Sequence, residues 1–252
     1  MENLSTTVNK AIDILEVFLQ KEGQLNLTEI SESTGLNVTT THRLLSTLTR
    51  RGYLSQQKKG VYSLGLKGLD FNYAIRRNLK FIDLAYLSMS KLSKEQNMSV
   101  YMAALDAESA LIIEEVGVTE DLRINSPVGK RLPLHCTACG KVFLASLSEK
   151  ERKEYYKSNT LKSLTAKTIT DISQLEKELK KIRTEGVAFD NEEYRMGLFI
   201  AAAPVYDGKG SVIAAAGIMV PISDIDTKSR QKFSSAIKSC TAKISQIVSR
   251  IS

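Results

Sequence analysis

Apolar residues recur along the first fifty residues with the three- and four-residue spacing of helices that bury one face. The first such run predicts a helix of about 14 residues, capped by Thr6 or Thr7 and ended by Gly23. Its predicted buried face holds Val8, Ile12, Leu15 and Leu19, with Ala11, Ile14 and Phe18 alongside. A second, shorter helix is predicted to begin near Leu27 and to stop at Gly35.

A third helix and a hairpin complete this first segment. The helix follows the N-cap residue Asn37 and runs to about Arg51. Two short apolar stretches come next, Tyr53–Leu54 and Val61–Leu64, with the polar, basic tip Gln56–Gly60 between them. Three helices followed by a hairpin are typical of a winged helix-turn-helix, in which the third helix enters the major groove of DNA.

The remainder of the chain predicts an α+β domain. Residues 67–97 are rich in apolar residues and lack proline, which predicts one helix to about Asn78 and another over about Phe81–Glu95. Strands are expected at about Val100–Leu105, Ala110–Val116, Leu122–Ser126, Val187–Phe189, Phe199–Tyr206 and Ser211–Met219. Helices are expected at about Thr137–Leu147, Glu149–Lys157, Ile172–Thr184 and Ile225–Ile251. Mixed strands covered by helices leave room for a ligand cleft.

The net charge changes this picture because of where it lies. The chain has 252 residues, with 35 Lys plus Arg and 28 Asp plus Glu, and a net charge of +7. The whole excess falls within residues 37–77, where Asp70 is the single acidic side chain. A charge run is ordinarily a solvated surface. This run coincides with the predicted recognition helix and hairpin, which favours nucleic acid as the partner.

Several classes of protein do not fit this composition. No apolar run approaches the roughly 18 residues that would span a bilayer. The N-terminus lacks the basic and apolar segments of a signal peptide. Three cysteines form no disulfide framework. We therefore expect a cytoplasmic protein with no membrane partner.

Three stretches of the chain resemble one family of proteins. LTEISESTGLNVTTTHRLLSTLTRRGYLSQQKKGVYSLG resembles the DNA-binding domain of the isocitrate-lyase-regulator (IclR) family of bacterial transcription factors. LPLHCTACGKVFLASLSEKE and GVAFDNEEYRMGLFIAAAPVYDGKGSVIAAAGIMVP resemble its C-terminal segments. The resemblance implies a winged helix over residues 1–66, a linker helix over 67–78 and a GAF-like effector domain over 79–252. It also implies a homodimer, or a dimer of dimers, on operator double-stranded DNA.

The third helix and the hairpin carry the candidate DNA contacts. These are Thr39, Thr40, His42, Arg43, Ser46, Thr47, Arg50, Arg51, Lys58 and Lys59. Arg43 is long enough for a bidentate contact to guanine, and the other basic residues are better placed for phosphates. In the IclR family this helix usually opens with Pro-Lys-Ser-Thr-Val, whereas residues 37–41 here read Asn-Val-Thr-Thr-Thr. One lysine contact is thus missing, and the operator sequence cannot be carried over.

The resemblance also places an effector site in the second domain. The matching positions are Ala138, Cys139, Asp190, Ile200, Gly217 and Met219. Family members that recognise small polar acids have Cys and Ser at the last three positions, so we expect a larger organic acid with an apolar or aromatic body. The alternative for Ile200 and Met219 is plain core. Asp190 either accepts a hydrogen bond from a ligand hydroxyl or caps a turn.

Other functions fit the sequence less well. The chain lacks a Gly-x-Ser-x-Gly elbow, a phosphate loop and a dinucleotide fingerprint, so we expect no enzyme activity, catalytic residue or cofactor. Cys136 and Cys139, beside His135, leave a redox- or zinc-responsive regulator open, although two buried structural thiols are the simpler interpretation and no metal site is predicted. An enzyme with a DNA-binding appendage and an architectural protein without an effector are further alternatives.

Overall fold

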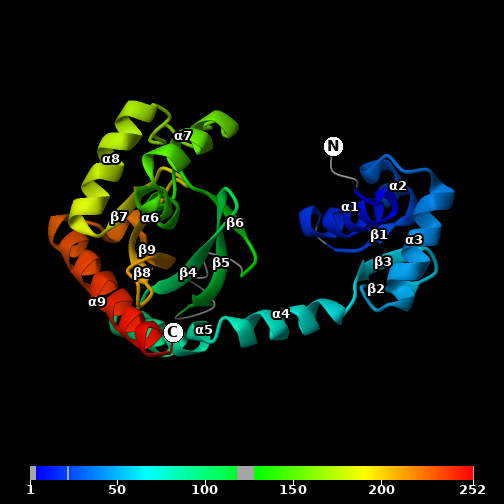
Figure 1. Ribbon diagram of the computed structural model, residues 1–252, viewed down its shortest axis with the longest axis horizontal. Coiled ribbons are helices and arrows are strands. Elements are labelled where there is room, and N and C mark those ends of the chain that lie inside the picture. Colours follow the sequence, from blue (N-terminus) through cyan, green and yellow to red (C-terminus); the bar gives the residue numbers. More distant parts are fainter. Residues whose placement is uncertain (1–3, 22, 118–127, 252) are drawn as a thin grey trace. The chain divides into compact units, whose positions relative to one another are not determined.

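The structure is a computed structural model that describes residues 4–21, 23–117 and 128–251 (Figure 1). The chain divides into two compact units, Met1–Leu79 and Lys80–Ser252. No helix in the described ranges combines the length and the apolarity needed to cross a membrane. The predicted strand Leu122–Ser126 falls outside the described residues.

The first unit packs three helices against a small antiparallel sheet. Helices α1 (Thr6–Gln20), α2 (Leu27–Thr34) and α3 (Val38–Arg50) surround strands in the order β1-β3-β2. The strands are β1 (Leu25–Asn26), β2 (Leu54–Lys58) and β3 (Val61–Leu64). The core is formed by apolar side chains from every one of these elements, including Ile14, Leu25, Ile30, Leu45, Leu54 and Tyr62. The predicted buried face of α1 is partly wrong, because Ile14, Val17 and Phe18 are buried whereas Val8, Ile12 and Leu19 are exposed.

Local side-chain chemistry sets the ends of these helices. Asn26 and Glu29 form a reciprocal capping box at the start of α2, and Gly35 ends it in the left-handed conformation that glycine adopts without strain. The Asn37 side chain accepts a hydrogen bond from Thr40 N at the start of α3, as predicted. The predicted cap of α1 is wrong. Ser5 is the N-cap residue and makes no side-chain capping bond, while Thr6 and Thr7 are already helical.

The hairpin differs from its prediction because polar residues extend its first strand. Gln56, Gln57 and Lys58 belong to β2 rather than to a loop, and β2 pairs with β3 through an irregular register at this point. Strand β2 lies at the edge of the sheet, where polar side chains face solvent without cost. The tip therefore shrinks to Lys59 and Gly60.

Helix α4 (Lys67–Asn78) closes the first unit and buries none of its side chains. Four large apolar or aromatic side chains of α4 are exposed, namely Leu69, Phe71, Tyr73 and Ile75. Leu66, just before the helix, is exposed as well. A single tilted ring contact, 6.0 Å between centroids, joins Phe71 to Tyr53. An amphipathic helix usually buries one face, so α4 carries an apolar surface without a partner within the described first unit.

The second unit is built on a six-stranded antiparallel sheet in the order β6-β5-β4-β9-β8-β7. Its strands are β4 (Ser99–Asp106), β5 (Ser109–Val116), β6 (Arg131–Pro133), β7 (Ala188–Asn191), β8 (Leu198–Tyr206) and β9 (Val212–Pro221). Helices α5 (Phe81–Gln96) and α9 (Thr227–Ile251) cover one face, and α6 (Ala138–Ser146) and α8 (Ile172–Glu185) the other (Figure 1). Helix α7 (Glu149–Ser158) follows α6.

Small residues on the sheet allow α6 to approach it closely. Ala103 on β4 is the register partner of Ala215 on β9, and Ala202 on β8 is the partner of Gly217. All three alanines belong to the same core cluster as α6. At the start of α6, a Cβ on Gly140 would lie 2.5 Å from Leu134 Cα, so only glycine fits there. The helix is therefore seated with its N-terminal turn against the preceding segment.

Candidate DNA interface and effector cavity

Helix α3 presents the predicted contact residues on its outer face. Thr39, His42, Arg43, Ser46, Thr47 and Arg50 are exposed, whereas Thr40 is half-buried. The opposite face holds Thr41, Leu44, Leu45 and Leu48 in the core. The Ser46 and Thr47 hydroxyls donate to the carbonyls of His42 and Arg43 one turn earlier, at 2.9 and 3.1 Å. Their oxygens still have lone pairs that face solvent.

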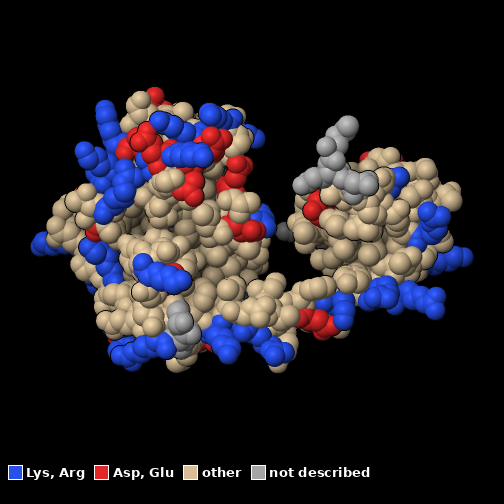
Figure 2. Space-filling model, in the orientation of Figure 1, with Lys and Arg blue, Asp and Glu red and all other residues tan. Residues whose placement is uncertain are grey.

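Basic side chains continue from α3 onto the hairpin. Arg51, Lys58 and Lys59 are all exposed. Figure 2 shows Lys and Arg atoms along the edge of the first unit that holds α3 and the β2–β3 hairpin. Lys67 of the same basic run pairs with Asp70 at 2.7 Å, so its charge is already balanced locally. The remaining exposed cations give this unit a positive surface suited to a polyanion.

The second unit contains a cavity of about 360 Å³ beside the start of α6. Its wall is mainly apolar, formed by Leu132, Leu164, Leu198, Ile200 and Met219. Tyr101 and Tyr194 add aromatic surface, and Thr137, Lys130 and Arg195 add polar groups. A larger hollow of about 530 Å³ lies at the C-terminal end of α6 and includes none of the predicted effector residues.

Two of the six predicted effector residues, Ile200 and Met219, form part of the cavity wall. Ala138, Cys139 and Gly217 are buried behind it and do not line it. The Tyr101 ring accounts for the position of Gly217, because a Cβ on that glycine would lie only 3.0 Å from the ring. The ring therefore covers the glycine and takes its place at the cavity surface. The Cys139 thiol donates to the Ala215 carbonyl at 3.5 Å.

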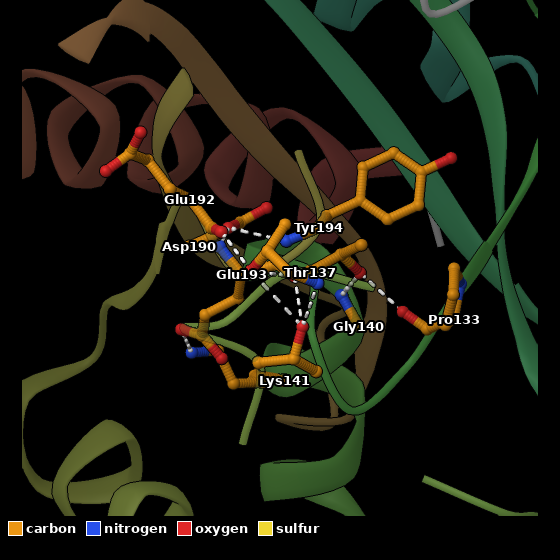
Figure 3. Close-up of polar contacts among 10 residues, drawn as sticks. Pro133, Thr137, Gly140, Lys141, Asp190, Glu192, Glu193 and Tyr194 are labelled. Atoms are coloured by element: carbon orange, nitrogen blue, oxygen red, sulfur yellow. Dashed lines mark hydrogen bonds and ion pairs between the residues drawn. The ribbon is translucent and has the colours of Figure 1, made fainter. Parts of the chain in front are cut away.

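Asp190, the sixth predicted residue, caps a turn. One of its carboxylate oxygens accepts hydrogen bonds from Glu193 N at 2.7 Å and Tyr194 N at 3.2 Å (Figure 3). These bonds fix the turn between β7 and β8, which carries Tyr194 and Arg195 to the cavity. Burial raises the pKa of Asp190 to about 7, despite the opposing effect of the two amides and of Lys141.

The start of α6 is held by Thr137, which sequence analysis had placed in the helix but not in the site. Its hydroxyl accepts a hydrogen bond from Gly140 N at 3.2 Å and donates one to the Pro133 carbonyl at 2.6 Å (Figure 3). The first amides of any helix lack partners within the helix. This turn thus places N–H groups and the positive end of a helix dipole next to the cavity.

Sequence reasoning missed most of the cavity wall. Tyr194 and Arg195 follow directly after the Asp-x-Glu-Glu segment, so proximity to that motif could have identified them. Tyr101 could have been found only from its pairing with Gly217 on the neighbouring strand. Leu164 and Lys130 lie on connecting segments with no distinguishing local pattern.

The two neighbouring cysteines are buried thiols. Cys136 and Cys139 are fully inaccessible, and burial raises the pKa of each to about 12. All three cysteines are free. Among the described residues, no group of three or more His, Cys, Asp or Glu side chains is arranged to hold a metal ion. The thiolate is the reactive and metal-binding form, so this setting favours a structural role.

Comparison with known proteins supplies the family. The family description "IclR helix-turn-helix domain" matches residues 7–58, and "Bacterial transcriptional regulator IclR C-terminal" matches residues 74–246. The chain belongs to the IclR family of bacterial transcriptional regulators. The winged helix-turn-helix followed by an α+β domain is confirmed with it.

Individual IclR-family proteins are similar over almost the whole chain. The regulator KdgR of Escherichia coli is 32% identical over 241 residues, which are 95% of this chain and 91% of KdgR. The crystal structure of Thermotoga maritima IclR is 28% identical, with a TM-score of 0.79 over 96% of this chain and 98% of that one. An IclR homologue from Microbacterium hydrocarbonoxydans, solved in complex with 4-hydroxybenzoate, shares the fold at 20% identity, with a TM-score of 0.87 over 98% and 100%.

Proposed function

We propose that this IclR-family regulator binds operator DNA through α3 and the β2–β3 hairpin, and that a small organic acid controls that binding. Arg43 contacts a base edge, with Thr39, Thr40, His42, Ser46 and Thr47 beside it. Arg50, Arg51, Lys58 and Lys59 contact phosphates. All of these side chains except the half-buried Thr40 are exposed, and they share one basic surface, which supports this assignment. Phosphate contacts position a protein on DNA, while base contacts give it specificity.

The effector we propose is an organic acid with an apolar or aromatic body. The cavity of about 360 Å³ carries this proposal, because its wall combines five aliphatic side chains with the cations Lys130 and Arg195. A pocket of this kind suits a ligand that has a buried body and one charged end. The relative solved with 4-hydroxybenzoate makes aromatic acids the first compounds to test.

Two copies of the chain are proposed to act together through α4. This helix, residues 67–78, links the winged helix of residues 1–66 to the effector domain of residues 79–252. Its exposed apolar surface supports a second copy as the partner. A dimer would present two recognition helices to two half-sites, as symmetric operators require. A dimer of dimers would repeat the arrangement.

The acid is proposed to act by binding one arrangement of the dimer more tightly than another, and not by being converted. A ligand shifts such an equilibrium only by its difference in affinity for the two states. Because the sign of regulation depends on where the operator lies, repression and activation both fit this mechanism.

Selection of bound DNA from a random library, repeated with candidate acids, tests the proposal. We expect a sequence with two related half-sites to be enriched, and the amount recovered to change with at least one acid that also raises the melting temperature. If only two- or three-carbon keto acids stabilise the protein, the proposed effector class is wrong. If an acid is recovered chemically changed, the chain is instead an enzyme with a DNA-binding appendage.

A further inference from the structure

Helix α9 carries six cations and no acidic residue along its 25 residues. All six are exposed, namely Lys228, Arg230, Lys232, Lys238, Lys243 and Arg250. The apolar residues of the helix, including Phe233, Ile237 and Ile244, are buried. Asp226, the acid just before the helix, accepts a hydrogen bond from Ser229 N at 2.7 Å and so caps its start. Every other exposed position between 227 and 250 is Ser, Thr, Gln or Ala, so the outward face of α9 is basic and otherwise small or polar.

Four of these cations share one side of the helix. At 3.6 residues per turn they lie within about 60° of one another around the helix axis and span about 33 Å along it. We call this row the α9 stripe, and it consists of Lys228, Lys232, Lys243 and Arg250. No member of the stripe forms an ion pair within the described ranges. The other two cations have local contacts, since Arg230 lies 4.2 Å from the centroid of the Phe189 ring and Lys238 donates to the Glu185 carbonyl at 2.8 Å.

Helix stability does not account for the stripe. On α7 of the same unit, Lys153 is compensated by Glu149 one turn earlier, at 2.6 Å. On α9, Lys228 and Lys232 are one turn apart as like charges, which disfavours a helix slightly. Lys228 also lies in the first turn, where the helix dipole disfavours a cation. A polyanionic partner would relieve both effects.

The chemistry of this face favours the phosphate backbone of DNA as that partner. Protein interfaces are enriched in aromatic residues, Met and Arg, and are depleted in Lys, Ser and Ala, which this face exposes together with Gln. A helix that lies on a membrane turns an apolar face outward, whereas α9 buries its apolar face. Phosphate contacts, by contrast, are made by Lys, Arg, Ser and Gln side chains and require no particular sequence.

We propose that the α9 stripe is a second DNA-binding surface, which contacts the phosphate backbone outside the bases that α3 reads. It adds affinity and salt dependence but no specificity, because it contacts phosphates alone. The length of DNA beside the operator then determines how tightly the regulator binds. This inference rests on the proposed function, since α3 must first bring the chain to an operator.

Duplexes of two lengths test the inference on the full-length chain. Both contain the sequence that the wild-type chain selects; one ends at the half-sites and the other continues for about 20 base pairs, or about two turns, on each side. We expect the longer duplex to bind the wild-type chain more tightly and with a steeper slope of log K against log salt concentration. Lys228→Gln, Lys232→Gln and Lys243→Gln together should make this slope shallower by about three for each chain bound through α9, and should leave affinity for the short duplex within about twofold.

Lys150→Gln, Lys153→Gln and Lys157→Gln together are the matched control, because they remove the same charge from exposed positions of α7. This control should bind both duplexes with the wild-type slopes. If the α9 variant keeps the wild-type gain from the longer duplex, or both variants lose it equally, the stripe does not bind DNA and the proposed function stands without it. The same conclusion follows if the wild-type chain gains nothing from the longer duplex. If the wild-type chain prefers no sequence, the proposed function fails and this inference fails with it.

Hydroxyl-radical footprinting gives an independent measurement. On the longer duplex, the wild-type chain should protect backbone positions outside the half-sites, and the α9 variant should lose only these protections. The substituted positions are exposed, so both variants should melt at the wild-type temperature. Protection confined to the half-sites in the wild type would overturn the inference.

Discussion

Lys141 and Glu193 form an ion pair of 2.5 Å between Nζ and Oε1 in the interior of the second unit. Their side chains are only 1% and 9% exposed. The pair joins α6, whose start faces the effector cavity, to the turn that carries Tyr194 and Arg195 (Figure 3). Glu193 Oε2 has no hydrogen-bond partner in the described part of the chain. The carboxylate thus depends on Lys141 for its compensation.

Lys141→Met should destabilise the second unit strongly. Removing the ammonium leaves a buried carboxylate without its counter-charge, which typically costs about 3–5 kcal/mol. Urea unfolding followed by circular dichroism, with the two units fitted as separate transitions, measures the loss. The control is Lys153→Met, which removes an exposed pair with Glu149 and should cost no more than about 1 kcal/mol. Equal losses in the two variants would contradict the role of the buried pair.

Asp190 should make the stability of this unit fall as the pH rises toward neutrality. Burial raises the pKa of Asp190 from 3.8 to about 7. Between these values the folded state binds more protons than the unfolded state, so each rise in pH favours unfolding. The free energy of unfolding of the wild type minus that of Asp190→Asn should therefore decrease between about pH 4 and pH 7, by at most about 1.4 kcal/mol per pH unit. Parallel curves for the two proteins would rule this out.

The elements that the sequence predicts well are those with local end signals. Asn37 starts α3 because its own side chain caps the helix, and Gly186 ends α8 because it adopts the left-handed conformation. Predictions failed for strands that are too short to show an alternating pattern. Strand β1 has two residues and β6 has three, and each exists only through pairing with a strand about twenty or more residues away.

The cavity was harder to predict because its key contacts are distant in sequence. Lys141 lies in an apolar stretch and is buried only because Glu193, 52 residues later, supplies the opposite charge. Tyr101 faces the cavity because Gly217 leaves space on a strand that pairs with it more than a hundred residues later. Spacing along the chain does not contain this information. The family resemblance located the region of the cavity, but it did not identify Tyr101 as part of the cavity wall.

Cys136 and Cys139 should be unreactive in the folded protein. Burial raises the pKa of both thiols to about 12, so almost no thiolate is present near neutral pH. Iodoacetamide at pH 8 should modify neither residue until urea unfolds the second unit, as mass spectrometry can determine. Correspondingly, Cys136→Ser with Cys139→Ser should not alter any response of operator binding to oxidant or zinc. A zinc or oxidant response that the double variant loses would restore the sensing alternative.

Lys58→Ala with Lys59→Ala should reduce the salt dependence of DNA binding. Each lysine that contacts a phosphate contributes about one to the slope of log K against log salt concentration. The slope should therefore become shallower by about two for each bound winged helix, in titrations between low and moderate salt. Lys180→Ala with Lys181→Ala, an exposed lysine pair on α8 of the other unit, should leave the slope unchanged. An unchanged slope in the first variant would mean that the hairpin does not contact the backbone.

Arg43→Ala should weaken binding to the selected operator and relax its sequence. The side chain is exposed in the middle of α3, one turn after the half-buried Thr40, where a recognition helix meets base edges. Alanine preserves the helix, so the expected loss of about 1–3 kcal/mol reflects the lost contact with a base. Repeating the selection with the variant should lower the preference at one position in each half-site.

Arg50→Ala, in the last turn of the same helix, is the comparison that separates base reading from charge. A phosphate contact weakens binding to operator and to unrelated DNA alike, because it carries no sequence information. Arg50→Ala should therefore reduce both affinities by similar factors and leave the selected sequence intact. If Arg43→Ala behaves in the same way, Arg43 is a phosphate contact. The specificity of α3 must then come from its hydroxyl side chains and His42.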